Sequence, residues 1–156
     1  DRAERGPDDV VRAEEVAGRG AEERGGARAE LVRGVDPAED EGAVVAVDAR
    51  TMKVRRSRTV GGDPLRVYTV DDERLLATDI AANTLTVFST DLRPIRSLQL
   101  DGTPAAVSFH PTEPRAYVSQ LGNNRVAVVD LDRLTVVGGF ATQLEPDSSV
   151  LLPATA

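Results

Sequence analysis

Few residues of this chain could act directly in catalysis. The sequence contains one histidine, His110, and no cysteine. It therefore excludes disulfides, thiolate metal sites and every mechanism that needs two imidazoles. As a general base, His110 would need a positioned acid, and Glu113 is the only one nearby. Its place between a predicted strand end and Pro111 favours a structural role in a turn.

The serines and glycines give no catalytic motif either. No serine lies in a Gly-x-Ser-x-Gly sequence, which the nucleophile elbow of a hydrolase requires. No glycine-rich phosphate loop leads from a strand into a helix, so Gly61-Gly62 and Gly138-Gly139 are interpreted as bulge or turn glycines. We therefore expect no catalytic residue, no metal site and no cofactor in this segment.

Carboxylates form the one dense group of chemically active side chains. Asp36, Glu39, Asp40 and Glu41 lie within six residues, a density that could supply the roughly six to eight oxygens that calcium takes. The spacing is not the Asp-x-Asp-x-Asp-Gly of an EF-hand loop. A solvated, charged loop is therefore the preferred interpretation.

Charge and hydropathy exclude two classes of partner. The formal charge of -7 and the pI near 4.8 argue against nucleic-acid binding, which needs a basic surface. No apolar run reaches the roughly 20 residues of a membrane-spanning helix.

Residues 1–42 hold 13 of the 26 acids, and all five aromatic residues follow residue 67. We therefore expect residues 1–27 to be disordered or partly helical and the packed core to lie in residues 28–156.

The elements that position these residues repeat along the chain. Val45-Ala46-Val47-Asp48 aligns with Thr86-Val87-Phe88-Ser89 and with Ala127-Val128-Val129-Asp130, so the last positions are 48, 89 and 130. Both steps are 41 residues. Pro64, Pro104 and Pro146 recur at nearly the same spacing. A period of this length is typical of stacked repeats such as propeller blades.

Alternation of apolar and polar residues predicts four short strands in each period. The expected strands are residues 28–33, 43–48 and 53–59 in the first period, 65–70, 74–78, 84–89 and 95–100 in the second, and 105–109, 115–119, 125–130 and 134–140 in the third. An opening strand of the first period is expected near residues 10–16. The breaks, such as Gly122-Asn123-Asn124, have the residues that tight turns need.

The third period carries the clearest family resemblance. Pro104-x-x-Val107-x-Phe109-x-Pro111, then residues 115–119, then Asn123-Asn124-x-Val126-x-Val128-Val129-Asp130, resembles the YVTN-type β-propeller repeat. The resemblance covers residues 28–146 and implies a bacterial, extracytoplasmic protein. Relatives of the family include binding and surface proteins, and similar blades occur in lactonases and haem d1 domains.

The predicted fold class is all-β: a partial β-propeller of about three four-stranded antiparallel blades, the first of them degenerate. The blades are expected at residues 28–63, 64–103 and 104–145, and a further blade begins in residues 146–156. Propellers usually have about four to eight blades. The chain is therefore interpreted as a fragment, and missing sequence would supply the rest of the propeller.

Strand connectivity gathers many of the acids on one side of such a blade array. The loop between the second and third strands of a blade lies on the same side as the loop to the next blade. The acids of these loops are Asp36, Glu39, Asp40, Glu41, Asp63, Asp79, Asp101 and Glu145, and the loops contain no Lys or Arg. Either they attract a cationic partner, or they are ordinary solvated turn residues.

Two functions are compatible with these features. The first is a non-catalytic binding or interaction module that presents the acidic loops to a protein or a small ligand. The alternative is part of a propeller enzyme, lactonase-like or associated with electron transfer, whose catalytic residues lie outside this segment.

Overall fold

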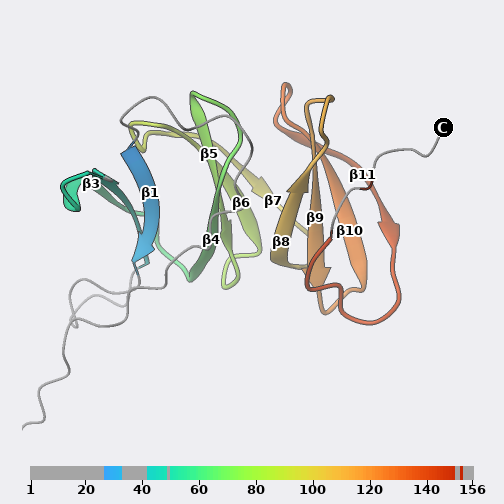
Figure 1. The fold of residues 1–156 in the computed structure, drawn as a ribbon. Coiled ribbons are helices and arrows are strands. Elements are labelled where there is room, and N and C mark those ends of the chain that lie inside the picture. Colours follow the sequence, from blue (N-terminus) through green and yellow to red (C-terminus); the bar gives the residue numbers. More distant parts are fainter. Residues whose placement is uncertain (1–26, 33–41, 49, 150–151, 153–156) are drawn as a thin grey trace, which may run out of the picture.

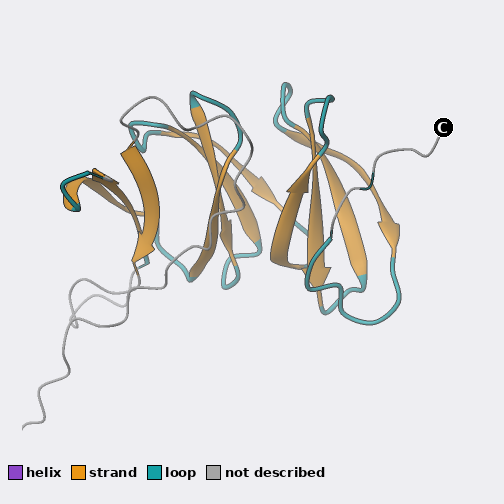
Figure 2. Ribbon diagram, viewed as in Figure 1, coloured by secondary structure: helices purple, strands orange, loops and turns teal. Residues whose placement is uncertain are grey.

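The described residues form eleven β-strands. The computed structural model describes residues 27–32 by their backbone, and residues 42–48, 50–149 and 152 in full; these residues contain no helix (Figure 2). The strands are β1 (Ala27–Val32), β2 (Ala43–Asp48), β3 (Lys53–Thr59), β4 (Pro64–Thr69), β5 (Arg74–Asp79), β6 (Thr84–Ser89), β7 (Pro94–Gln99), β8 (Thr103–Phe109), β9 (Arg115–Leu121), β10 (Arg125–Asp130) and β11 (Thr135–Ala141). The segment 1–26, with its expected disorder and its expected strand near residues 10–16, lies outside the described residues.

The strands form three antiparallel sheets that stand beside one another in an open arc (Figure 1). The first has the order β1-β2-β3, the second β4-β5-β6-β7 and the third β8-β9-β10-β11. Within each sheet, consecutive strands of the sequence pair with each other, as expected for a propeller blade. The partial propeller predicted from the repeat is therefore confirmed, with three described strands in the degenerate first blade.

The strand boundaries match the predicted ones to within two residues. The second and third sheets each begin at or next to a proline, Pro64 and Pro104. Proline is tolerated there because the first strand of each sheet is an edge strand and one of its N–H groups can be spared. Residues 146–149, where a further blade was expected to begin, pair with no strand. The Oγ atoms of Ser149 and Ser108 lie 2.8 Å apart, which places this segment beside β8.

A β-bulge confirms the predicted equivalence of the three periods. It recurs in the pairing of the third strand with the fourth strand of each blade, between Ala46 and Val47, between Val87 and Phe88, and between Val128 and Val129. These positions are 41 residues apart. Such a bulge increases the local twist of a strand pair, so the repeat conserves a twist as well as a residue pattern.

Apolar side chains fill the two spaces between the sheets. Val44, Ala46, Leu75, Ala77 and Phe88 form the core between the first and second sheets. A larger core between the second and third sheets contains Leu76, Leu85, Val87, Leu98, Leu100, Val107, Ala116, Val118, Ala127, Val129 and Leu131. Successive residues of β5 and β6 alternate between the two cores because strand side chains point to opposite faces.

The first and last strands of the blades have different environments. The first strands of the second and third sheets contact each other. The Val107 N–H on β8 donates to the Tyr68 hydroxyl on β4 at 3.1 Å, and the Tyr68 and Phe109 rings meet edge to face. In β3, the last strand of the first sheet, all seven residues are exposed, and four of them are Lys or Arg. Charged outer strands discourage pairing with another sheet.

Candidate functional site

The loops predicted to carry acids do lie together at one end of the sheets. Residues 60–63, 80–83, 100–102 and 122–124 connect strands at this end, and the chain after β11 also leaves from it. Its described acids, Asp63, Asp79, Asp101 and Glu145, are called the loop face below. Four further predicted members, Asp36, Glu39, Asp40 and Glu41, lie outside the described residues.

Asp79 joins the first blade linker to the turn between β5 and β6. Its Oδ1 accepts hydrogen bonds from the N–H of Asp63 at 3.2 Å and of Ala82 at 2.8 Å. The Ile80 N–H donates to the Asp63 carbonyl at 3.0 Å. Gly62, at φ +63°, lies so close that a Cβ there would be 2.0 Å from Asp79 Oδ2. Asp79 therefore holds this end of the second sheet together, as a turn-forming aspartate does.

Asp101 and Glu145 are more accessible. Both are exposed, and their carboxylates make no hydrogen bond or ion pair with any residue that the structure describes. Glu145 is positioned through its backbone, because its N–H donates to Asn124 Oδ1 at 2.8 Å. These two carboxylates could meet a cationic partner without breaking an existing contact.

Gln120 takes the place of Asp79 in the third blade, 41 residues later. It is fully buried, and its Oε1 accepts a hydrogen bond from Asn123 Nδ2 at 2.7 Å. Asn123 lies against Gly102, where a Cβ would be 2.5 Å from its Nδ2. Gln120 Nε2, Asn123 Oδ1 and Ser119 Oγ are buried without a hydrogen-bond partner. Such atoms are rare in folded proteins and call for an explanation.

A cavity of about 360 Å³ opens beside Gln120, between the second and third sheets. Its lining consists of Gln99, Leu100, Asp101, Gln120, Arg125, Ala127, Val136 and Gly138. The lining thus combines an apolar floor with one carboxylate, one guanidinium and two amides. This size is near the lower end of small-molecule sites, which span about 300–1,000 Å³.

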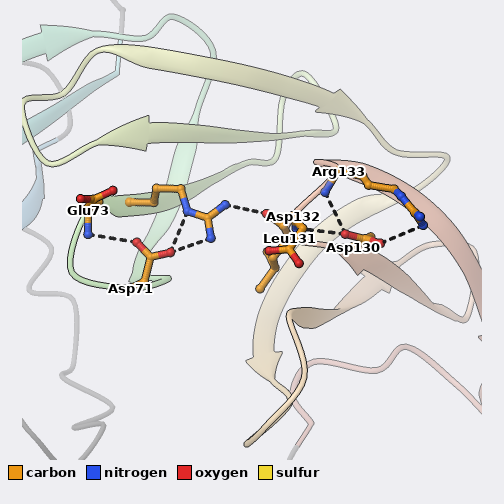
Figure 3. A network of polar contacts seen from close by, with 7 residues as sticks. Asp71, Glu73, Asp130, Leu131, Asp132 and Arg133 are labelled. Atoms are coloured by element: carbon orange, nitrogen blue, oxygen red, sulfur yellow. Dashed lines mark hydrogen bonds and ion pairs between the residues drawn. The ribbon is translucent and has the colours of Figure 1, made fainter.

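The opposite end of the sheets has a different electrostatic character, because five of its acids form ion pairs with arginines. Ion pairs there join Asp48 to Arg55, Asp91 to Arg56, Asp71 to Arg74, Glu113 to Arg115 and Asp130 to Arg133. Figure 3 shows two of these pairs in neighbouring sheets, around Asp71 and around Asp130. This end is called the arginine end below.

The aspartates at the arginine end also close turns. Asp130 Oδ1 accepts the N–H groups of Asp132 at 2.9 Å and Arg133 at 2.8 Å (Figure 3). The Arg133 N–H makes the largest contribution to lowering the pKa of Asp130. At the equivalent position in the first blade, the Thr51 N–H and then the Arg55 side chain lower the pKa of Asp48. Hydrogen bonds that favour the charged carboxylate have this effect.

His110 has the structural role that the sequence predicted. Its Nδ1 accepts the N–H groups of Glu113 at 2.9 Å and Thr112 at 3.3 Å, which closes the turn between β8 and β9. Its Nε2 lies 3.9 Å from Glu113 Oε1. With Nδ1 occupied by two backbone donors, the imidazole is a turn element. Within the described part of the chain, no three His, Cys, Asp or Glu side chains are close enough to bind a metal ion.

Sequence reasoning missed Gln120 and Arg125 as members of a possible site. Neither residue belongs to a known motif, and Gln120 directly follows the predicted strand 115–119. The departure from the repeat was the available signal: Gln120 replaces Asp79, and Arg125 replaces Thr84, at the same step of 41 residues.

The arc of sheets is similar to solved β-propeller structures. Hydrazine synthase from Kuenenia stuttgartiensis matches with a TM-score of 0.62 and 24% identity, over 67% of this chain and 31% of that one. AztD from Citrobacter koseri, in its apo form, matches with a TM-score of 0.58 and 11% identity, over 68% of this chain and 31% of that one. The dihydro-haem d1 dehydrogenase NirN in complex with DHE matches with a TM-score of 0.57 and 12% identity, over 73% of this chain and 28% of that one. At these identities the likeness shows the fold alone.

The chain spans about a third of the length of the structures that it matches. No protein-family model and no curated protein matches it. Within the described residues, there is no helix of the length and apolar character needed to cross a membrane.

Proposed function

We propose that the chain is a non-catalytic binding module, part of a larger YVTN-like, extracytoplasmic propeller, and that its loop face binds a cationic segment of a partner protein or a cationic small ligand. The separation of charge between the two ends of the sheets carries this proposal. At the arginine end five acids form ion pairs with arginines, whereas Asp101 and Glu145 on the loop face are exposed and contact no described cation. Clustered, uncompensated charge steers an oppositely charged partner.

The alternative is part of a propeller enzyme. It is supported by the names of two similar structures, a hydrazine synthase and a dihydro-haem d1 dehydrogenase. The active groups would then come from sequence beyond this segment, because His110 is a turn element and the loop face contributes only carboxylates.

A charge-matched pair of variants tests the binding function. The loop-face variant carries Asp101→Asn and Glu145→Gln, and the control carries Asp72→Asn and Asp132→Asn, two exposed acids at the arginine end. The probe is a fluorescent octalysine peptide, followed by stopped-flow anisotropy at low and physiological salt. Exposed charges act through steering and are screened over about 8 Å at physiological salt.

We expect the loop-face variant to slow association about threefold or more at low salt, the control to have a much smaller effect, and salt to abolish the difference. Neutralising Asp36, Glu39, Asp40 and Glu41 together should slow association further while leaving dissociation nearly unchanged. Equal effects of the two double variants would show that the peptide responds only to the net charge, and the proposal would then be wrong.

A further inference from the structure

The last strand of the first sheet, β3, carries a run of positive charge. Residues 49–62 contain five Lys or Arg and no acid, and four of these cations lie on β3, where every residue is exposed. The last strands of the other two sheets differ: β7 contains one arginine, and β11 contains no charged residue. Protection of an edge against chance pairing would be needed on all three strands. It therefore does not explain four cations on one of them.

Ion pairs within the described part of the chain occupy only some of these cations. Arg55 pairs with Asp48, and Arg56 lies 3.5 Å from Asp91 in a pair whose two side chains are both more than half exposed. Such exposed pairs hold their members weakly. Lys53 and Arg58 make no hydrogen bond or ion pair with any residue that the structure describes. Three cations of β3 can thus meet an acidic partner at little cost.

The backbone of β3 is also open on one side. In the described sheet, β3 pairs with β2 alone. The Val60 N–H donates to the Gly42 carbonyl at 2.9 Å, and hydrogen-bonded pairs alternate with non-hydrogen-bonded pairs along an antiparallel ladder. Arg58 therefore bonds to β2, whereas the N–H and C=O of Ser57 point to the free edge. A further strand could hydrogen-bond to Ser57 without breaking the existing sheet.

The register places two arginines where the side chains of such a strand would be read. Arg56 and Arg58 lie opposite Ala46 and Val44, so they share the face that β2 turns toward the second sheet. In a strand added at Ser57, the residues opposite these arginines would form non-hydrogen-bonded pairs, in which side chains are closest. Opposite charges in directly opposed positions are stabilising. Acids at every second position of the added strand would therefore face Arg56 and Arg58.

We propose that β3 is a docking strand for an extended acidic segment of a partner protein. The segment would add to the first sheet beyond β3, pair with the backbone of Ser57, and present acidic side chains at every second position to Arg56 and Arg58. In this mode of recognition, backbone hydrogen bonds give affinity and alternate side chains give specificity. The inference goes beyond the proposed function and shares no residue with the loop face.

Three features favour an acidic peptide strand over other occupants. The free N–H and C=O groups of β3 match a peptide backbone, which a nucleic acid lacks. The whole chain has a formal charge of -7, which opposes the binding of a long polyanion. The four cations also disfavour pairing of β3 with β3 of a second copy, because like charges in opposed positions are destabilising.

Three fluorescent probes of equal length separate these occupants. The first is a peptide of four Glu-Thr repeats, which has an acid at every second position. The second has the same composition in two blocks, four glutamates followed by four threonines. The third is an oligothymidylate of eight nucleotides. Anisotropy measures the dissociation constants, and carbodiimide coupling of peptide carboxylates to Lys53, the only lysine of the chain, shows where the peptide lies.

The charge variant carries Arg56→Gln and Arg58→Gln, and its matched control carries Arg96→Gln and Arg125→Gln, two exposed arginines on other strands. The charge variant is expected to weaken binding of the Glu-Thr peptide about fivefold, because it removes two charge pairs between opposed side chains. The control should change the dissociation constant less than about twofold. The block peptide and the oligothymidylate should each bind wild type at least about fivefold more weakly than the Glu-Thr peptide does.

The backbone variant is Ser57→Pro, and its control is Ser97→Pro at the equivalent register of β7. Proline is tolerated in an edge strand where the N–H faces solvent, so both variants should fold. Ser57→Pro is expected to weaken binding of the Glu-Thr peptide about tenfold and to reduce its coupling to Lys53 in parallel, because the free edge loses a donor. Ser97→Pro should change neither result. The charge variant leaves the backbone unchanged and tests the inference even where Ser57→Pro fails to fold.

Three results would overturn the inference. Equal binding of the Glu-Thr peptide and either other probe would indicate a patch that attracts any polyanion. A folded Ser57→Pro variant that binds as wild type does would show that no strand is added. Equal losses in the charge variant and its control would indicate an effect of net charge. Octalysine binding to the loop face does not involve β3, so the two proposals can fail separately.

Discussion

The Arg74 guanidinium on β5 donates a hydrogen bond from Nη1 to the Leu131 carbonyl of the third sheet at 2.5 Å. The same group contacts Asp71 Oδ2 from Nε at 2.7 Å and from Nη2 at 2.6 Å, in the network of Figure 3. Two residues 57 positions apart are thus joined across the interface between two blades. The contacts of Arg74 with Asp71 and the Leu131 carbonyl, called the clamp below, therefore add polar interactions to this interface beside the apolar core.

Removing the clamp should loosen the interface between the second and third sheets. Arg74→Met is expected to lower the free energy of unfolding by about 1–3 kcal/mol, because it removes a charge-assisted hydrogen bond and leaves the Leu131 carbonyl without this donor. Urea denaturation followed by circular dichroism measures the change. Arg96→Met, at an exposed position on β7, is the control and should change stability by less than about 0.5 kcal/mol. Similar values for both variants would contradict a role for the clamp.

The clamp should also make stability depend on acid pH. Burial raises the pKa of Asp71, but hydrogen bonds from the Arg74 side chain and the Glu73 N–H outweigh it, and the pKa is lowered overall. A carboxyl with a lowered folded pKa stabilises the protein above its unfolded pKa of about 3.9, and this contribution is lost as the pH falls through the folded value.

Wild type should therefore be more stable than Asp71→Asn at pH 7, and the gap should narrow as the pH falls below about 4. Unfolding free energies measured at several pH values between 7 and 3 test this expectation. A gap that stays constant over this range would show that the Asp71 charge does not contribute.

Phe88 should be a major source of core stability. It lies in the core between the first and second sheets and is 2% exposed, whereas Phe140 on β11 is 51% exposed. Phe88→Ala is expected to cost about 3–5 kcal/mol, because it removes a buried ring and leaves a cavity. Phe140→Ala is the matched control and should cost far less. A loss below about 1 kcal/mol for Phe88→Ala would contradict the observed register.

Neighbouring glycines allow backbone strain to be separated from a specific contact. Gly61 and Gly62 both have positive φ, but only Gly62 lies against the Asp79 carboxylate. Alanine at either position should cost about 1 kcal/mol through strain. Gly62→Ala should cost about 1–2 kcal/mol more, because Asp79 must move away from the Asp63 and Ala82 N–H groups.

A double-mutant cycle isolates the contact. Asp79→Ala should be less costly in the Gly62→Ala background than in wild type, whereas its cost should be unchanged in the Gly61→Ala background. Thermal denaturation of the six proteins measures these differences. Strict additivity in both backgrounds would show that the Gly62–Asp79 contact has no energetic role.

The strands and their order could be predicted because the information is local. Alternation in residues such as Thr84 to Val87, and turn residues such as Asn83 and Asn124, identify strand and hairpin from a few neighbouring positions. Both asparagines have the positive φ that this hairpin needs. The 41-residue step then placed Val47, Phe88 and Val129 in equivalent positions, and the recurring bulge confirms that equivalence.

The candidate site was predictable only in part. Connectivity placed Asp63, Asp79, Asp101 and Glu145 at one end, because antiparallel strands alternate in direction. Their separate roles were not predictable: Asp79 proved to be a turn and linker acceptor, whereas Asp101 lines a cavity. Which carboxylate has a partner depends on the distances between loops of different blades, and no local pattern reports those distances.

By itself, the sequence determined the strand content, the repeat and the end of the sheets on which the acids lie, because each follows from side-chain alternation and chain direction. Only the tertiary structure decided that Arg74 reaches Leu131 and that Gln120, Arg125 and Asp101 surround one cavity. Those contacts join residues of different blades, and they depend on how the twisted sheets pack against each other. Sheet packing is set by the summed shape of many side chains, which no single position in the sequence encodes.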